Sequence, residues 1–111
     1  MRRIDLLGVD DVPVGTMKMA WAEGSDPVLV INQEGEFTAI QGICSHEYFE
    51  LDKGFLTAGT ITCALHLSRF DLSDGEPLDP PADLPLAVYP VVVEDGRVLI
   101  EVPDGPLEVF E

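Results

Sequence analysis

The chain has few cysteines, histidines and basic residues, and these shortages exclude several classes of protein. Its 111 residues include two cysteines and two histidines, and six lysines and arginines stand against 21 aspartates and glutamates, a net charge of −15. Such an acidic surface repels nucleic acid and anionic membranes, so neither is an expected partner. No apolar run approaches the ~20 residues of a membrane helix, and the N-terminus does not resemble a signal peptide, so we expect a cytoplasmic protein.

Sustained helical periodicity is also absent, and the remaining pattern is that of short β-strands. Runs of β-branched and aromatic residues predict strands at 17–21, 28–31, 37–40, 91–93 and 98–100. Asp95-Gly96, between the last two runs, favours a type I′ hairpin turn, which needs positive φ at both central residues. Pro90 lacks the N–H that a central strand donates, so it indicates a sheet edge or a bulge.

The length indicates one all-β domain with a single core and no need of disulfides. Most of the strong strands lie in residues 1–41 and 86–111, which we expect to form an antiparallel β-sandwich or barrel-like base. Residues 42–85 contain every cysteine and histidine. We expect this segment to form an inserted, cluster-binding lobe of the same folding unit.

The cysteines and histidines stand in two short pairs. Cys44 and His46 form the first pair and Cys63 and His66 the second, in the pattern C-x-H-x16-C-x2-H. Thiolate and imidazole are the ligands that soft and borderline metals prefer, and core packing does not explain why all four copies are matched in this way. The sequence therefore predicts that these four residues bind one metal centre.

Two kinds of centre use two cysteines and two histidines. A structural zinc ion is bound tetrahedrally, usually with Cys next to Cys and His next to His along the chain. A mixed-ligand [2Fe–2S] cluster has both thiolates on one iron and both imidazoles on the other. Because each pair here supplies one Cys and one His, the order favours the iron–sulfur centre, with a zinc-stabilised interaction module as the alternative. With both histidines as ligands no Ser–His or Cys–His nucleophile is left, which favours an electron carrier over an enzyme.

The motif and its flanks resemble the Rieske-type ferredoxins of bacterial multicomponent oxygenases, over nearly the whole chain. Residues 11–15 resemble the family's N-terminal turn, residues 69–71 follow the second ligand pair as in the family, and residues 77–85 occupy the place of its proline loop. The resemblance implies the Rieske fold, one [2Fe–2S] cluster, an NAD(P)H-dependent flavoprotein reductase as electron donor and a terminal oxygenase as acceptor.

That acceptor would be a Rieske dioxygenase or a soluble diiron hydrocarbon monooxygenase, and residues 60–63 and 67–70 favour the diiron group by resemblance. An accessory subunit like the small subunit of nitrite reductase is a further alternative. Such subunits usually lack the ligands that this chain has, which counts against it.

The resemblance also assigns residues around the cluster. Rieske proteins of cytochrome complexes have two more cysteines in a disulfide, and the matching positions here are Phe49 and Leu65. With both cysteines as ligands, a reducing compartment fits. High-potential members have a serine and a tyrosine that hydrogen-bond to the cluster, at positions matching Ser68 and Phe70. Ser68 is either this donor or a solvent-facing loop residue. Because Phe70 has no hydroxyl, we expect a potential in the low part of the Rieske range of roughly −150 to +300 mV.

Acidic residues follow both ligand pairs. They are Glu47, Glu50, Asp52, Asp71, Asp74, Glu76, Asp79 and Asp83. If both pairs lie at one tip, the acid either attracts a basic partner in fast, salt-sensitive encounters or serves solubility alone. The chain itself is expected to be a monomer.

Overall fold

The structure is a computed structural model, and it describes residues 2–21, 27–43, 50–57, 59–64, 67–79 and 85–102. These residues form ten strands, β1 (Arg2–Gly8), β2 (Thr16–Ala20), β3 (Val28–Gln33), β4 (Glu36–Gln41), β5 (Phe55–Thr57), β6 (Thr60–Thr62), β7 (Arg69–Asp71), β8 (Val88–Tyr89), β9 (Val91–Glu94) and β10 (Arg97–Val102). Two single-turn 3₁₀ helices are also present, η1 (Val9–Asp11) and η2 (Leu51–Lys53). Over these ranges no helix is long and apolar enough to cross a membrane.

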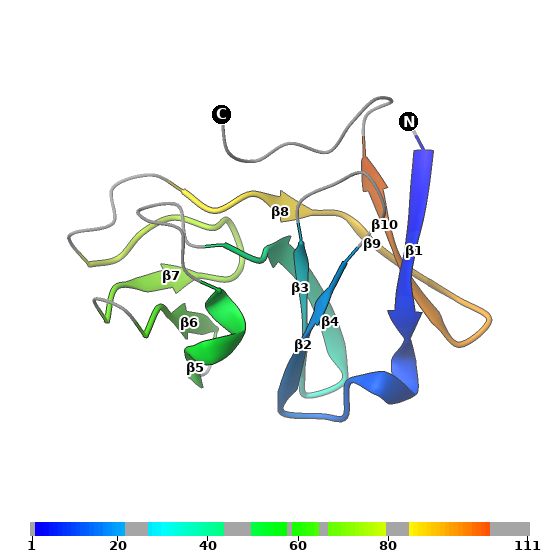
Figure 1. Cartoon of the computed structure of the whole chain (residues 1–111), viewed down its shortest axis with the longest axis horizontal. Helices are drawn as coiled ribbons and strands as arrows, with labels where there is room; N and C mark the ends of the chain where they lie inside the picture. The colour runs from blue at the N-terminus through cyan, green and yellow to red at the C-terminus, as the bar shows by residue number, and fades with distance from the viewer. Residues whose placement is uncertain are drawn as a thin grey trace.

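The strands make three antiparallel sheets, in the orders β1-β10-β9, β2-β3-β4-β8 and β5-β6-β7. Figure 1 shows β5, β6 and β7 together at one end of the molecule and β1 and β10 at the other, with β3 and β4 between them. The expected all-β antiparallel architecture is confirmed. The third sheet lies entirely within residues 42–85, the segment that we interpret as the cluster-binding lobe.

The β3–β4 and β9–β10 hairpins follow the turn chemistry of the sequence. β3 and β4 are joined by Glu34 and Gly35, with φ of 56° and 91°, and β9 and β10 by Asp95 and Gly96, with φ of 51° and 74°. Positive φ at both central residues is the type I′ requirement, and its twist matches that of the paired strands. The predicted hairpin at Asp95-Gly96 is therefore confirmed.

Pro90 separates two edge strands that belong to different sheets. β8 pairs with β4 and β9 pairs with β10, so the chain changes sheets at the proline. The missing N–H costs nothing there, while the Pro90 carbonyl accepts the N–H of Glu101 at 3.0 Å. The edge expectation is confirmed, and the register irregularity of this sheet lies instead in β1, between Asp5 and Leu7.

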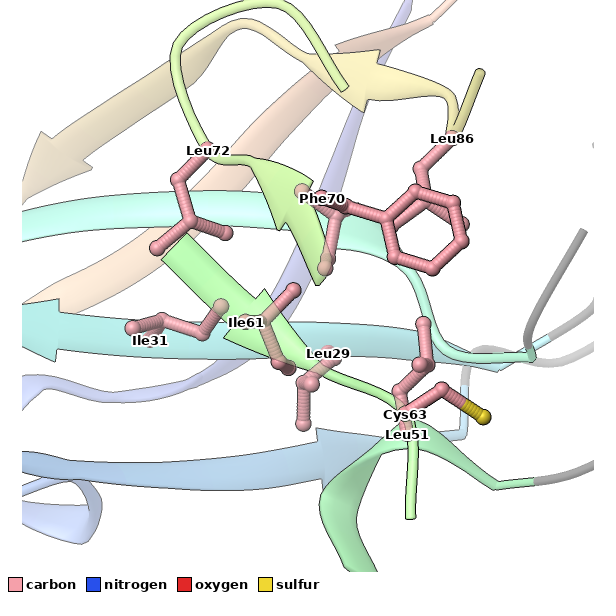
Figure 2. Packing of buried hydrophobic residues seen from close by; sticks show 9 residues of the cluster. Leu29, Ile31, Leu51, Ile61, Cys63, Phe70, Leu72 and Leu86 are labelled. Carbon is pink, nitrogen blue, oxygen red and sulfur yellow. The ribbon is translucent and has the colours of Figure 1, made fainter. Parts of the chain in front are cut away.

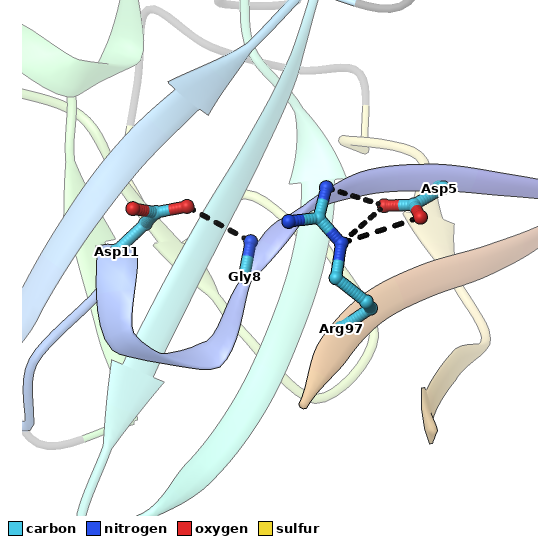
Figure 3. Close-up of polar contacts among 4 residues, drawn as sticks. All are labelled: Asp5, Gly8, Asp11 and Arg97. Carbon is cyan, nitrogen blue, oxygen red and sulfur yellow. Dashed lines mark hydrogen bonds and ion pairs between the residues drawn. The ribbon is translucent and has the colours of Figure 1, made fainter. Parts of the chain in front are cut away.

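Ion pairs join β1 to β10 on the solvent side. The Arg97 guanidinium contacts Asp5, with Nη2 2.9 Å from Oδ1, and these contacts raise the pKa of Arg97, chiefly through the hydrogen bond (Figure 3). At the end of β1 the N–H of Gly8 donates to Asp11 Oδ2 at 2.9 Å, which closes the turn into η1. These contacts hold the N-terminal strand in register, far from the third sheet.

β3 is buried on both faces and forms the middle layer. Its alternate residues face opposite sides. Val28 and Val30 pack toward the first sheet, in clusters that include Val98 and Ile100 of β10. Leu29 and Ile31 pack toward the third sheet, in the cluster of Ile40, Leu51, Ile61, Cys63, Phe70, Leu72 and Leu86 (Figure 2). A strand covered on both sides has a continuous apolar sequence, which explains the run 28–31.

Candidate metal centre

Cys63 is the ligand candidate that the structure describes, whereas Cys44, His46 and His66 lie outside the described residues. It follows β6 directly and is 2% exposed, as a member of the core cluster between the second and third sheets. Figure 2 shows its sulfur at the edge of that cluster, pointing away from Ile31. A buried sulfur at the end of a paired strand is held in one position, as a metal ligand must be.

The backbone after Cys63 closes a tight loop. The N–H of Leu67 donates to the Cys63 carbonyl at 2.9 Å, and the Cys63 N–H donates to the Ser68 carbonyl at 2.9 Å. Leu67 has φ of 59° and is 63% exposed, a strained conformation for a residue with a Cβ and one that concentrates at functional sites. The loop that contains His66 in the sequence is therefore closed at its base by two backbone hydrogen bonds.

Ser68 and Phe70 both point inward. Ser68 is 2% exposed, so the interpretation as a solvent-facing loop serine is wrong, because β7 turns alternate residues into the core. Phe70 is fully buried opposite Ile61 and belongs to the same cluster as Cys63. Phe49 and Leu65, at the positions of the missing disulfide, lie outside the described residues.

The chain on either side of the first ligand pair is also closed by backbone contacts. Ile43 and Glu50 form an isolated antiparallel bridge, and the Leu51 N–H donates to the Gly42 carbonyl at 2.8 Å. A Cβ on Gly42 would overlap the sulfur of Met19, so a larger residue here would have to displace that side chain. The residues on either side of 44–49 are therefore held next to each other, and η2 lies against β2.

A third connection holds the chain before residues 80–84. Leu78 donates its N–H to the Arg69 carbonyl at 2.7 Å. The Arg69 guanidinium donates two hydrogen bonds to the Asp79 carboxylate, from Nε to Oδ2 at 2.6 Å and from Nη2 to Oδ1 at 3.2 Å. The hydrogen bond from Arg69 lowers the pKa of Asp79, and the same contact raises the pKa of Arg69. Asp79 therefore serves this ion pair as well as adding acid to the surface.

Sequence reasoning missed Gln41. The residue is 4% exposed, and its side-chain amide hydrogen-bonds to the backbone of Ile43 and Ala87. Alternation does not reveal it, because the last three residues of β4 are all buried. A glutamine at the end of a strand is usually solvated, so only the tertiary structure shows the role of Gln41.

The described residues fit a centre shared by the two ligand pairs. Leu51, which follows the first ligand segment, and Cys63, which opens the second, belong to one buried cluster (Figure 2). The described ends of the two ligand segments therefore meet in the same part of the core. Two sulfur and two imidazole donors match the ligand set of a mixed-ligand [2Fe–2S] cluster, as they do that of a Cys₂His₂ zinc site.

Comparison with known proteins identifies the family. Residues 3–90 match the model of the Rieske [2Fe–2S] domain. The chain belongs to this Rieske family. It is 40% identical over 107 residues to the 3-phenylpropionate/cinnamic acid dioxygenase ferredoxin subunit of Shigella flexneri serotype 5b, covering 95% of this chain and 98% of that one.

Solved structures agree with this assignment. The Sphingomonas yanoikuyae B1 ferredoxin superposes with a TM-score of 0.86 at 29% identity, covering 92% of this chain and all of that one. A chain in a complex of reduced oxygenase and oxidized ferredoxin in carbazole 1,9a-dioxygenase superposes with a TM-score of 0.82 at 28% identity, covering 88% of this chain and 91% of that one. The predictions of a Rieske fold, one [2Fe–2S] cluster and a ferredoxin rather than an enzyme are confirmed, and the zinc alternative is wrong.

Proposed function

We propose that this Rieske ferredoxin serves an aromatic-ring dioxygenase system and carries single electrons from a reductase to the terminal oxygenase. The observation that carries the proposal is the C-x-H-x16-C-x2-H motif in a chain that is 40% identical to a dioxygenase ferredoxin subunit over 107 residues.

Cys44 and Cys63 are assigned as ligands of one iron, and His46 and His66 as ligands of the other. A bound [2Fe–2S] cluster accepts and donates one electron and has no open coordination position for a substrate. The chain contributes a dry, fixed support, because Cys63 is buried and the loop after it is closed by backbone hydrogen bonds. A rigid support keeps the geometry similar in both oxidation states, which suits rapid electron exchange.

The negative charge of this chain favours a partner with a basic docking surface. The net charge is −15, and Lys53, Arg69 and Arg97 each lie within ion-pairing distance of a carboxylate. These positive groups are therefore neutralised locally, and the long-range field of the chain is that of its acids. A terminal oxygenase or reductase with basic residues at its docking face would be steered toward such a field.

The relatives favour a dioxygenase as the terminal partner. The matching ferredoxin subunit is named for a dioxygenase, and the similar chain seen with an oxygenase comes from a dioxygenase complex. The preference for a diiron monooxygenase, which rested on residues 60–63 and 67–70, has no support among them. The proposal further includes an NAD(P)H-dependent flavoprotein reductase as electron donor and a monomeric state. It also includes a cytoplasmic location, because a chain whose two cysteines are both assigned as ligands fits a reducing compartment.

Electron paramagnetic resonance of the purified, dithionite-reduced protein tests the centre. We expect iron and inorganic sulfide in equal amounts and a mean g value below that of clusters with four cysteine ligands. Replacing His66 by Cys, which keeps a ligand but removes an imidazole, should raise the mean g value and lower the potential. Stoichiometric zinc without sulfide would overturn the proposal.

Electron transfer to a ring-hydroxylating dioxygenase tests the partner. Stopped-flow reduction of the oxygenase by the reduced ferredoxin should slow as ionic strength rises, because salt screens the attraction. Failure to reduce any ring-hydroxylating dioxygenase, together with rapid reduction of a diiron hydroxylase, would reverse the choice of partner.

A further inference from the structure

Gln41 connects two segments that border the metal centre. It ends β4, three positions before Cys44. Its Nε2 donates to the Ile43 carbonyl at 2.8 Å, and its Oε1 accepts the N–H of Ala87 at 2.6 Å. The Gln41 N–H also donates to the Ala87 carbonyl at 2.9 Å. One buried side chain therefore joins the residue before Cys44 to the chain that follows residues 80–84.

Further hydrogen bonds extend this connection toward the second ligand pair. Next to Ala87, the Leu86 N–H donates to the Gly75 carbonyl at 2.8 Å, and the Gly75 N–H donates to the Asp71 carbonyl at 2.7 Å. Asp71 ends β7, the strand that begins directly after Ser68. This series of hydrogen bonds therefore connects the first ligand segment, through Gln41, to the strand that follows the second ligand pair.

We propose that Gln41 is a positioning residue for the metal centre, whose amide sets the spacing between the two ligand-bearing segments. The inference rests on the proposed function, because it concerns the cluster ligands. Both polar ends of the amide are paired with backbone groups, and the bond to Ile43 is buried, so its loss would leave the Ile43 carbonyl without this donor in the protein interior. Without the amide, the backbone bond from Gln41 to the Ala87 carbonyl remains, but the side-chain bridge from Ile43 to the Ala87 N–H is lost and the two segments are held less firmly.

Asn32 offers a matched control in the same sheet. It is 5% exposed, its Nδ2 donates to the Val12 carbonyl at 2.8 Å, and its Oδ1 accepts the N–H of Gly35 at 3.0 Å. It thus makes the same kinds of side-chain hydrogen bond as Gln41. Its partners lie next to η1 and in the β3–β4 turn, at the end of the hairpin away from Gln41.

The experiment compares Gln41→Met with Asn32→Leu, substitutions that keep side-chain size and remove the donor and the acceptor. Both variants should melt at lower temperature than wild type. Only Gln41→Met should change the EPR g values and the reduction potential, because only it alters the support of the ligands. It should also bleach about tenfold faster in chelator than Asn32→Leu, the factor that corresponds to one buried hydrogen bond.

Wild-type g values and potential in Gln41→Met would overturn the inference, and so would equal shifts in Asn32→Leu. If Gln41→Met does not fold, Gln41→Glu, which keeps the acceptor for Ala87 and loses the donor to Ile43, is compared with Asn32→Asp. A change of g values confined to Gln41→Glu supports the inference, and unchanged g values in it refute the inference. A wild-type protein without a [2Fe–2S] signal would instead refute the proposed function.

Discussion

Replacing Gly75 by alanine should destabilise the protein more than the same replacement at a turn glycine whose Cβ would meet no other atom. Gly75 has φ of 80°, and a Cβ built on it would overlap the carbonyl oxygen of Leu86. Its own carbonyl accepts the Leu86 N–H at 2.8 Å. Alanine therefore brings two separate costs at this position, the strain of a left-handed L-residue and the displacement of the Leu86 backbone.

Gly35 separates the two costs. It has φ of 91°, but no atom lies within 4 Å of a Cβ built there, so Gly35→Ala brings the strain alone. That strain is about 1–2 kcal/mol for an L-residue. The overlap at Gly75 adds about 1–3 kcal/mol, the usual cost of forcing atoms into a packed site. We therefore expect losses of about 1–2 kcal/mol for Gly35→Ala and about 2–5 kcal/mol for Gly75→Ala.

Thermal unfolding followed by circular dichroism measures both variants at one scan rate. At roughly 4–8 °C for each kcal/mol in a domain near this size, Gly35→Ala should melt several degrees below wild type and Gly75→Ala about twice as far below it. Visible absorbance recorded in the same scans reports the cluster, which should be lost at a lower temperature in Gly75→Ala. Equal melting temperatures for the two variants would show that Leu86 moves aside freely, and the reasoning from backbone overlap would fail.

Phe70→Tyr should raise the reduction potential, measured by film voltammetry, by up to about 40 mV. A hydrogen bond of about 1 kcal/mol from the new hydroxyl to a cysteine sulfur corresponds to that shift for one electron. An unchanged potential would mean that the buried hydroxyl does not reach the sulfur. Ser68→Ala should lower the potential if the buried serine donates to the cluster, whereas a variant that is only less stable would assign Ser68 a packing role. Asp79→Asn should melt below wild type at neutral pH, because the Arg69 hydrogen bond lowers the pKa of the Asp79 carboxyl. This stabilisation is present above the unfolded-state pKa of about 3.9 and is lost as the pH falls through the lower folded-state pKa. The difference in melting temperature between the variant and wild type should therefore vanish in acid. A difference that stays constant with pH would contradict the ion-pair explanation.

Local chemistry made the hairpins and the cofactor predictable. Asp95-Gly96 satisfies a turn rule that involves only neighbouring residues, and the structure has the required positive φ at both. The two Cys–His pairs are equally local, because ligand identity and order distinguish a mixed-ligand cluster from a zinc site before any coordinates are known. Membership in the Rieske family confirmed that interpretation.

Burial of polar groups could not be predicted in this way. The sequence is compatible with Ser68 as a buried donor or as an exposed loop residue, and only the packing of β7 on the core shows that Ser68 is buried. The pairing of Arg69 with Asp79 joins residues ten positions apart across an irregular turn, and nothing in their spacing indicates it.

The amino-acid sequence alone determined the cofactor class, the electron-carrier role and the strand pairs closed by short turns, because each depends on side-chain chemistry or on adjacent residues. The tertiary structure alone decided that β3 is the middle layer, that Cys63 sits in the core shared by the second and third sheets, and that Gln41 ties Ile43 to Ala87. These features depend on contacts between segments far apart in the chain, and such contacts form only when the sheets pack and exclude water from between them.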